Sequence, residues 1–315
     1  MKAMILAAGL GTRLRPLTEL RAKPALPILG RPVISLLLDL LDHHGIREVM
    51  INLHYLPESI REAVTRHPPR NIALTWSEEP EPLGTGGGLR RAAEFLASDP
   101  ECVVLAGDML LDLDLSGLVD RHRRSGRDVS LILREDPRGE DFGTIGVDDG
   151  GRVVRVGETA VGTGARESRE GLFTGVRIFS QRALVEWPDV SVFEDLRDWL
   201  IPRMRRGASS GVDVGAEFVG PDESVWEPVG TPAEYLRVNL SPPELPSIGG
   251  ESENWRGDVE ILGPPADVIL GAHAHVAAGA KLSRCVVWED EHVPADCAGS
   301  DGVFAGGKFH ACLED

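Results

Sequence analysis

The residues that most constrain this chain lie in the N-terminal stretch 3–25, AMILAAGLGTRLRPLTELRAKPA. The apolar residues Ala3 to Leu6 predict a buried strand, and a run of small residues from Ala7 to Gly11 follows it directly. Such a turn lets backbone N–H groups approach an anion closely, because no side chain stands in the way. A plain tight turn is the alternative, but the arginines and the lysine that follow favour a phosphate site.

Two common phosphate-binding motifs do not fit this turn. Leu14 stands where a dinucleotide fingerprint needs its third glycine, and no Gly-Lys-Ser/Thr follows as in a P-loop. Lys23 is informative, because the chain has only four lysines and otherwise uses arginine. A lysine at this position, just before Pro24, indicates that a compact ammonium group is needed there, with a solvated surface lysine as the alternative.

Over its whole length the stretch resembles the signature of the sugar-1-phosphate nucleotidylyltransferases, the NDP-sugar pyrophosphorylases. The matching residues are Leu6-Ala7-Ala8-Gly9, Gly11-Thr12-Arg13-Leu14, Pro16-Leu17-Thr18 and Lys23-Pro24. The resemblance extends with gaps to about Leu240. Within the family, the sequence most resembles the mannose-1-phosphate guanylyltransferases. It implies that Ala7, Ala8, Gly9, Gly11 and Thr12 bind the nucleotide, and that Arg13 and Lys23 are catalytic.

Apolar periodicity predicts helices over 32–44 and 57–66 and strands over 47–53 and 71–76. This alternation is typical of an α/β fold, a Rossmann-like, mostly parallel sheet with helices on both faces. Such sheets bind ligands at the carboxyl ends of their strands, so the loops there are expected to converge on one crevice.

A second glycine-rich stretch, 78–89 (EEPEPLGTGGGL), precedes a helix predicted over 89–96. A flexible surface turn is one interpretation. The resemblance implies instead that Leu83, Gly84, Thr85 and Gly87 lie beside the nucleobase, with Glu79 or Glu78 as an acidic partner. The Leu-Gly-Thr form looks more like guanylyltransferases than thymidylyltransferases.

Asp108 follows the buried strand predicted over 101–106. A carboxylate at a strand end suits Mg²⁺, which prefers oxygen ligands and offsets phosphate charge. The alternative is a cap of the next turn; in the family this aspartate is a metal ligand. The resemblance also implies sugar contacts at Gly143, Glu158, Thr174 and Gly175.

Two positions depart from the family pattern. Thr159 stands where a lysine normally holds the sugar phosphate, and Pro228 stands where a second metal aspartate is expected. Glu227 is the neighbouring carboxylate, although adjacent residues of an extended chain point to opposite sides. These departures motivate the rival hypothesis of a catalytically weak or inactive regulatory, nucleotide-sugar-binding paralogue.

The chain is expected to comprise a catalytic domain (1–240), a linker rich in Pro, Gly and Ser (241–256) and a C-terminal segment (257–315). In that segment Leu270, Val276 and Leu282 recur every six residues, as do Val287 and Val293. Hexad repeats predict rungs of a left-handed β-helix. So short a stack must bury its open end on the main domain or on another subunit, which allows a homo-oligomer.

Composition excludes some partners. A formal charge of −17 and a pI near 5.0 argue against nucleic acid and anionic membranes. The four cysteines lack paired spacing and are expected to be reduced thiols. With no signal-peptide pattern and no apolar run long enough to span a bilayer, the protein is expected to be cytoplasmic.

These features predict an enzyme that moves a nucleoside monophosphate from an NTP to a sugar 1-phosphate and releases pyrophosphate. GTP with mannose 1-phosphate is the first expectation, and glucose 1-phosphate with dTTP or UTP is the second. The joint presence of Arg13, Lys23 and Asp108 favours the enzyme over the regulator.

Overall fold

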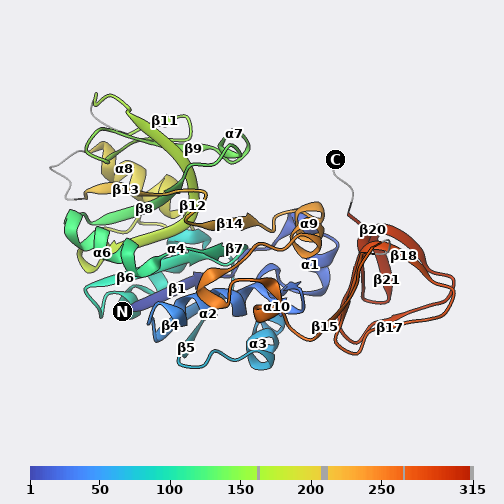
Figure 1. Ribbon diagram of the computed structural model, residues 1–315. Helices are drawn as coiled ribbons and strands as arrows, with labels where there is room; N and C mark the ends of the chain where they lie inside the picture. The colour runs from blue at the N-terminus through green and yellow to red at the C-terminus, as the bar shows by residue number, and fades with distance from the viewer. Residues whose placement is uncertain (162–163, 207–211, 265–266, 313–315) are drawn as a thin grey trace.

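The structure is a computed structural model, and it describes residues 1–161, 164–206, 212–264 and 267–312. Parallel strands lie side by side in the order β6 (Glu101–Ala106), β1 (Lys2–Leu6), β4 (Glu48–Leu53) and β5 (Ala73–Glu78). Ile5 pairs with Ile51 on one side and with Leu105 on the other. The carboxyl ends of these strands therefore meet at one edge, and the predicted α/β class is confirmed (Figure 1).

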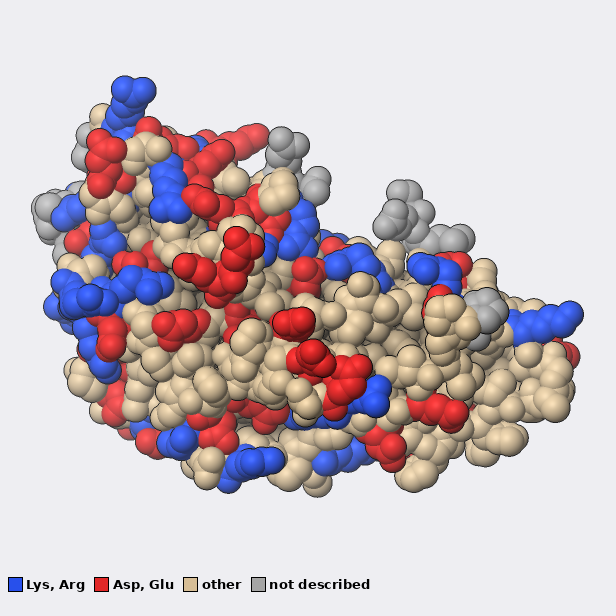
Figure 2. Space-filling model, in the orientation of Figure 1, with Lys and Arg blue, Asp and Glu red and all other residues tan. Residues whose placement is uncertain are grey.

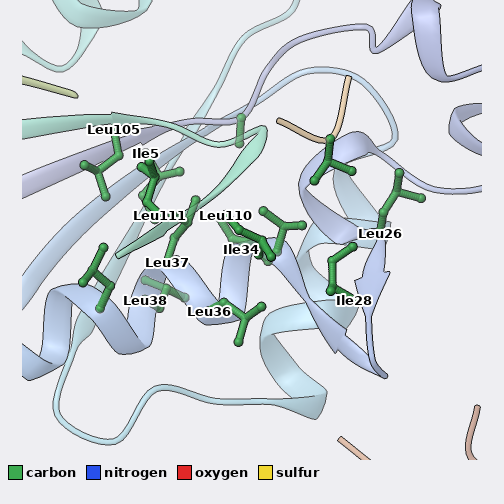
Figure 3. Close-up of a cluster of buried hydrophobic side chains, with 14 of the residues drawn as sticks. Ile5, Leu26, Ile28, Ile34, Leu36, Leu37, Leu38, Leu105, Leu110 and Leu111 are labelled. Carbon is green, nitrogen blue, oxygen red and sulfur yellow. The ribbon is translucent and has the colours of Figure 1, made fainter. Parts of the chain in front are cut away.

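Helices pack on both faces of this sheet. One apolar core joins Ala3 and Ile5 to α2 (Val33–His43), α3 (Pro57–Arg66) and α6 (Leu115–Ser125). A second core joins Met4 to α4 (Gly84–Arg91) and α5 (Ala93–Leu96). Because successive side chains of a strand point to opposite faces, β1 contributes to both cores. In Figure 3 the leucines of α2 lie beneath Ile5 and Leu105 in the first core.

A long strand, β12 (Arg169–Ser180), extends the sheet beyond β6 and runs antiparallel to it. It also pairs with β8 (Val129–Arg134) and β9 (Thr144–Val147). Strand β9 pairs in antiparallel fashion with β10 (Val153–Val156), and β11 (Thr159–Ala160) lies at the edge. Strand β13 (Val214–Val219) runs parallel to β8.

A two-stranded ribbon of β7 (Met109–Asp112) and β14 (Val225–Pro228) leads into α9 (Pro232–Leu240). Thr231 and Glu234 form a capping box at the start of α9, which satisfies backbone N–H groups there. The remaining short elements of the main body are η1 (Thr12–Leu14), α1 (Leu17–Leu20), η2 (Lys23–Ala25), β2 (Pro27–Ile28), β3 (Arg31–Pro32), α7 (Gly139–Phe142), η3 (Gln181–Ala183), η4 (Asp195–Leu200) and α8 (Ile201–Arg205).

The segment predicted as a linker lies against the main body. It contains η6 (Pro246–Ile248) and α10 (Ser252–Trp255). The backbone N–H and hydroxyl of Ser247 donate to the carboxylate of Asp112, at 2.8 and 2.6 Å. Leu245 and Trp255 are buried, so apolar contacts hold the segment at two further points.

The C-terminal strands form the β-helix-like segment that the hexad pattern predicts, seen at the right of Figure 1. Strands β16 (Val268–Gly271), β18 (Lys281–Val287) and β20 (Ala298–Ala305) are parallel neighbours, and β17 (His275–Val276) pairs in parallel with β19 (His292–Val293). Strands β15 (Val259–Leu262) and β21 (Lys308–Ala311) close the two sides in antiparallel pairing. Leu270, Val287 and Val293 lie in its core.

Charged side chains of both signs are interspersed over the main body in Figure 2, whereas the C-terminal segment is mostly uncharged in that view. Among the helices of the described ranges, none has the length and apolar character needed to cross a bilayer.

Candidate active site

A cleft of about 460 Å³ lies at the carboxyl ends of β1, β5 and β6, where the sequence predicts a crevice. The turns after these strands and residues of β12 form its walls. The predicted site residues that line it are Ala7, Ala8, Gly9, Gly11, Thr12, Arg13, Lys23, Glu79, Leu83, Gly84, Thr85, Asp108 and Gly175.

The two glycines of the first turn serve different purposes. Gly11 has a φ of +61°, and a Cβ there would lie 2.9 Å from Cγ2 of Thr18, so the turn geometry requires glycine. The hydroxyl of Thr18 donates to the Gly11 carbonyl at 2.8 Å and holds the turn. A Cβ on Gly9 would meet nothing within 4 Å. Gly9 therefore leaves free space in the cleft wall.

Lys23 and Asp108 form an ion pair in the cleft wall. The ammonium nitrogen of Lys23 lies 2.9 Å from Oδ2 of Asp108. Lys23 is at the start of η2, a turn that the buried residues Leu26 and Ile28 anchor in the core (Figure 3). A cation and a carboxylate therefore lie together in the same cleft as the backbone N–H groups of the first turn.

The second oxygen of Asp108 fits a metal ligand. Its Oδ1 atom is buried and has no hydrogen-bond partner among the described residues. Within the same residues, no group of three or more His, Cys, Asp or Glu side chains is arranged to hold a metal ion. Mg²⁺ is commonly bound by one or two carboxylates together with water and substrate phosphates, and Asp108 meets that requirement.

Arg13 lies at the exposed rim of the cleft, close to Gly230. A Cβ on Gly230 would lie 3.5 Å from Nη2 of Arg13. The N–H groups of Gly230 and Thr231 donate to the carboxylate of Glu234, at 2.6 and 3.0 Å. The cap of α9 thus fixes the part of the wall that Arg13 faces.

Glu79 is buried, and its carboxylate holds the cleft wall together. Oε1 accepts from the amide of Asn52 at 2.8 Å, and Oε2 accepts from the Leu83 N–H at 3.2 Å. Asn52 in turn accepts from the Ala7 N–H at 2.7 Å. This chain of bonds connects the first turn to the second glycine-rich stretch. Asn52 was not predicted as a site residue, although a polar residue at the end of a buried strand is a usable signal.

The second glycine-rich stretch differs from the prediction, because α4 begins at Gly84 and not at Leu89. The N–H groups of Gly86 and Gly87 donate to the Phe193 carbonyl, at 3.0 and 3.2 Å. A Cβ on Gly86 would lie 2.3 Å from the Phe193 ring. These two glycines are needed for close packing, and Gly87 is not among the residues found to line the cleft.

The chain near residue 194 supplies site groups that the sequence did not reveal. Helical structure begins here at Asp195, the first residue of η4, and Asp195 lies in its first turn. The hydroxyl of Thr85 lies 2.6 Å from a carboxylate oxygen of Glu194 and 2.7 Å from one of Asp195, and it donates its single proton to one of them at a time. Asp195 also forms an ion pair of 2.5 Å with Arg177, and both are buried. Arg177 and Glu194 line the cleft. Their place there follows from contacts in the folded chain, and no sequence pattern indicates it.

Three of the four predicted sugar-side residues are not among those that line this cleft. Thr174 is fully buried, and its hydroxyl donates to the Ile132 carbonyl at 2.9 Å. Glu158 is exposed between β10 and β11, and Gly143 precedes β9. Of this set, Gly175 is the residue found in the cleft wall.

The carboxylate of Glu227, considered as a substitute metal ligand, is bound to two arginines. Its Oε2 accepts from Arg237 at 2.7 Å and from Arg138 at 3.2 Å. Glu227 is also absent from the cleft wall. Of the two carboxylates considered as metal ligands in the sequence, Asp108 lines the cleft and Glu227 does not.

Residues 2–242 match the family model described as nucleotidyl transferase. The chain belongs to this family. The predicted resemblance to sugar-1-phosphate nucleotidylyltransferases is confirmed, and the protein is an enzyme of the nucleotidyltransferase class. The match ends at α9 and the residues just after it, so it covers the cleft and leaves the β-helix-like segment outside.

Curated relatives align over most of the chain. A UTP–glucose-1-phosphate uridylyltransferase of Synechocystis sp. is 30% identical over 311 residues, covering 90% of this chain and 76% of the relative. A mannose-1-phosphate guanylyltransferase of Mycobacterium tuberculosis is 29% identical over 307 residues, covering 94% and 82%.

A solved structure shares the fold. HddC from Yersinia pseudotuberculosis, complexed with GMP-PN, superposes with a TM-score of 0.62 at 24% identity, over 76% of this chain and 97% of that one.

Proposed function

We propose that this enzyme transfers a nucleoside monophosphate from an NTP to a sugar 1-phosphate and releases pyrophosphate. The observation that carries the proposal is the Lys23–Asp108 pair beside the glycine turn, within a cleft of nucleotide size. In the reaction an oxygen of the sugar phosphate bonds to the α-phosphorus of the NTP. The bond from that phosphorus to the β-phosphate oxygen breaks, and pyrophosphate leaves with the electron pair.

The residues of the cleft have separate tasks in this reaction. Backbone N–H groups around Gly9, Gly11 and Thr12 cradle the triphosphate, and Arg13 offsets its charge. Lys23 bridges the reacting phosphates, where a fixed cation stabilises charge in the transition state. Asp108 orients Lys23 in the free enzyme through the 2.9 Å contact. Holding both substrates in line supplies much of the rate enhancement.

Asp108 is also the residue that would hold Mg²⁺. Bound there, Mg²⁺ would supply charge neutralisation and would polarise phosphate oxygens. The unpaired Oδ1 of Asp108 supports this assignment.

For the substrates we propose GTP and mannose 1-phosphate. The Mycobacterium tuberculosis relative of that name covers more of this chain than the uridylyltransferase does, 94% against 90%. Glucose 1-phosphate with UTP is the second candidate, favoured by the uridylyltransferase with 30% identity.

The regulatory alternative rests on Pro228 and Thr159, which replace two family residues. It accounts less well for the Lys23–Asp108 pair in the cleft.

The test is pyrophosphate release by the purified protein with Mg²⁺, with each NTP against a panel of hexose 1-phosphates. We expect release that requires both substrates, is fastest with GTP and mannose 1-phosphate, and is strongly slowed in Asp108→Asn. Release with UTP and glucose 1-phosphate alone would replace the substrate assignment. NTP binding without release from any pair would support the regulatory alternative.

A further inference from the structure

The β-helix-like segment contacts the main body through Trp288 and Glu289, which follow β18 directly. The Trp288 ring is buried, and its N–H donates to the hydroxyl of Tyr235 on α9 at 2.9 Å. That hydroxyl donates in turn to the Pro27 carbonyl at 2.7 Å. Figure 1 shows α9 and α1 beside this end of the segment. Segments far apart in sequence are therefore joined by buried hydrogen bonds, which are costly to break.

Glu289 forms ion pairs with two arginines of the main body. Its Oε1 atom lies 2.7 Å from Nη1 of Arg21 and 2.6 Å from Nη1 of Arg66. The two arginines come from different elements, since Arg66 ends α3 and Arg21 follows α1. Arg21 makes one further contact, with its guanidinium 4.5 Å from the centre of the Trp288 ring. Arg21 is thus held both by charge and by stacking.

Arg21 is two residues before the catalytic Lys23. Between them, Ala22 is buried, and its N–H donates to the hydroxyl of Ser59 at 2.9 Å. The next turn closes through the N–H of Leu26, which donates to the Lys23 carbonyl at 3.1 Å. On the other side, a Cβ on Gly306 would lie 3.0 Å from a methyl group of Leu20. The backbone that carries Lys23 therefore has the C-terminal segment as one of its supports.

We propose that the C-terminal segment positions the catalytic lysine, with Glu289 and Arg21 as the positioning residues. Loss of the Arg21 contacts frees the backbone before Lys23 and lets its ammonium group move from the place set by Asp108. Small displacements of a group at the reacting phosphates slow the chemical step strongly. The inference rests on the proposed function for its kinetic consequence, but its structural consequence can be measured without turnover.

The test compares Arg21→Ala with Arg66→Ala. Each variant removes one ion pair to the same oxygen of Glu289 and leaves the other in place, so both weaken the same interface. We expect Arg21→Ala to lower kcat by about tenfold or more, with the KM values for both substrates nearly unchanged. Arg66→Ala should keep kcat within about twofold of the wild type, because an exposed ion pair contributes little. Arg21→Lys should recover most of the lost kcat.

Amide hydrogen exchange provides the second readout. In Arg21→Ala the amides of Ala25 and Leu26, which close the Lys23 turn, should exchange faster than in the wild type, and in Arg66→Ala they should not. Equal kcat losses in the two alanine variants, or unchanged exchange in Arg21→Ala, would overturn the proposal. If the wild type releases no pyrophosphate with any pair, the proposed function fails, and the exchange comparison alone decides the positioning role.

Discussion

The ammonium nitrogen of Lys23 lies 2.9 Å from Oδ2 of Asp108, although 85 positions separate the two residues. Lys23 is the first residue of η2, and Asp108 lies just after the end of β6. Each charge orients the other before any substrate arrives, since charge-assisted hydrogen bonds are the strong ones. A cation and a carboxylate are thereby preorganised at one point of the cleft.

Replacing Lys23 tests its catalytic role. We expect Lys23→Ala to lower kcat by at least about a hundredfold, because a fixed cation at the reacting phosphates is lost. Pyrophosphate release under saturating substrates measures this. Lys281→Ala, at an exposed lysine of β18, is the matched control and should leave kcat unchanged. Near wild-type turnover in Lys23→Ala would refute the assignment.

Asp108 and Glu227 should differ in their effect on the Mg²⁺ requirement. Asp108→Asn is expected to raise the Mg²⁺ concentration needed for half-maximal rate by about tenfold or more, measured on its residual rate. Glu227→Gln should leave it unchanged, because that carboxylate is bound to Arg138 and Arg237. A titration of rate against Mg²⁺ decides between them. A large shift in Glu227→Gln would show that this carboxylate reaches the metal.

The variant Gly9→Ala separates an effect on NTP binding from an effect on the stability of the fold. A methyl group there meets nothing in the free protein, so the free energy of unfolding should stay within about 0.5 kcal/mol of the wild type. The same methyl group would occupy the cleft wall where phosphates are expected, and the KM for NTP should rise by about tenfold. Unchanged KM for NTP would place the phosphates elsewhere. Chemical unfolding and initial rates provide the two measurements.

Gly86→Ala, in contrast to Gly9→Ala, should lower the free energy of unfolding. Its Cβ would lie 2.3 Å from the Phe193 ring, so α4 or the 193–195 segment must shift. Overpacking of this kind typically costs about 1–3 kcal/mol of stability. Urea unfolding measures the loss. A variant as stable as the wild type would show that Phe193 moves aside freely.

The free energy of unfolding should decrease as the pH is lowered, because His122 is buried. Burial lowers the pKa of this imidazole to about 4, against 6.5 when unfolded, and its ring nitrogens bond to Ser130 and Ser180. Between those pKa values the unfolded chain binds the proton more tightly than the folded protein does. The contribution of His122 to the free energy of unfolding is therefore complete above pH 6.5 and is lost as the pH falls. The expected loss between pH 7 and pH 5 is about 2 kcal/mol. His122→Gln should flatten this dependence in unfolding curves recorded at several pH values, and an unchanged slope would contradict the assignment.

Local sequence was enough to predict several of the strands and helices around the cleft. Helix α3 has the predicted bounds, 57–66, and β6 has the predicted bounds, 101–106, because apolar periodicity and strong end signals coincide there. Thirteen of the predicted site residues line one cleft, since most of them lie in the segments that follow strands whose carboxyl ends share an edge. The hexad pattern likewise predicted the C-terminal strands.

Other features depended on contacts between distant segments. The glycines at 86 and 87 look like a loop in sequence, but they form a helix because Phe193 packs against them. Arg177, Asp195 and Thr85 meet only in the folded chain.

The sequence by itself thus determined the family, the parallel sheet and the cations and carboxylate of the cleft, because these follow from local pattern and strand order. Only the tertiary structure decided that Glu79 bonds to Asn52, that Glu227 is bound to arginines, and that Glu289 reaches Arg21 beside Lys23. Such pairings join residues far apart in the chain, and their partners are fixed by packing geometry, which residue spacing along a single sequence does not record.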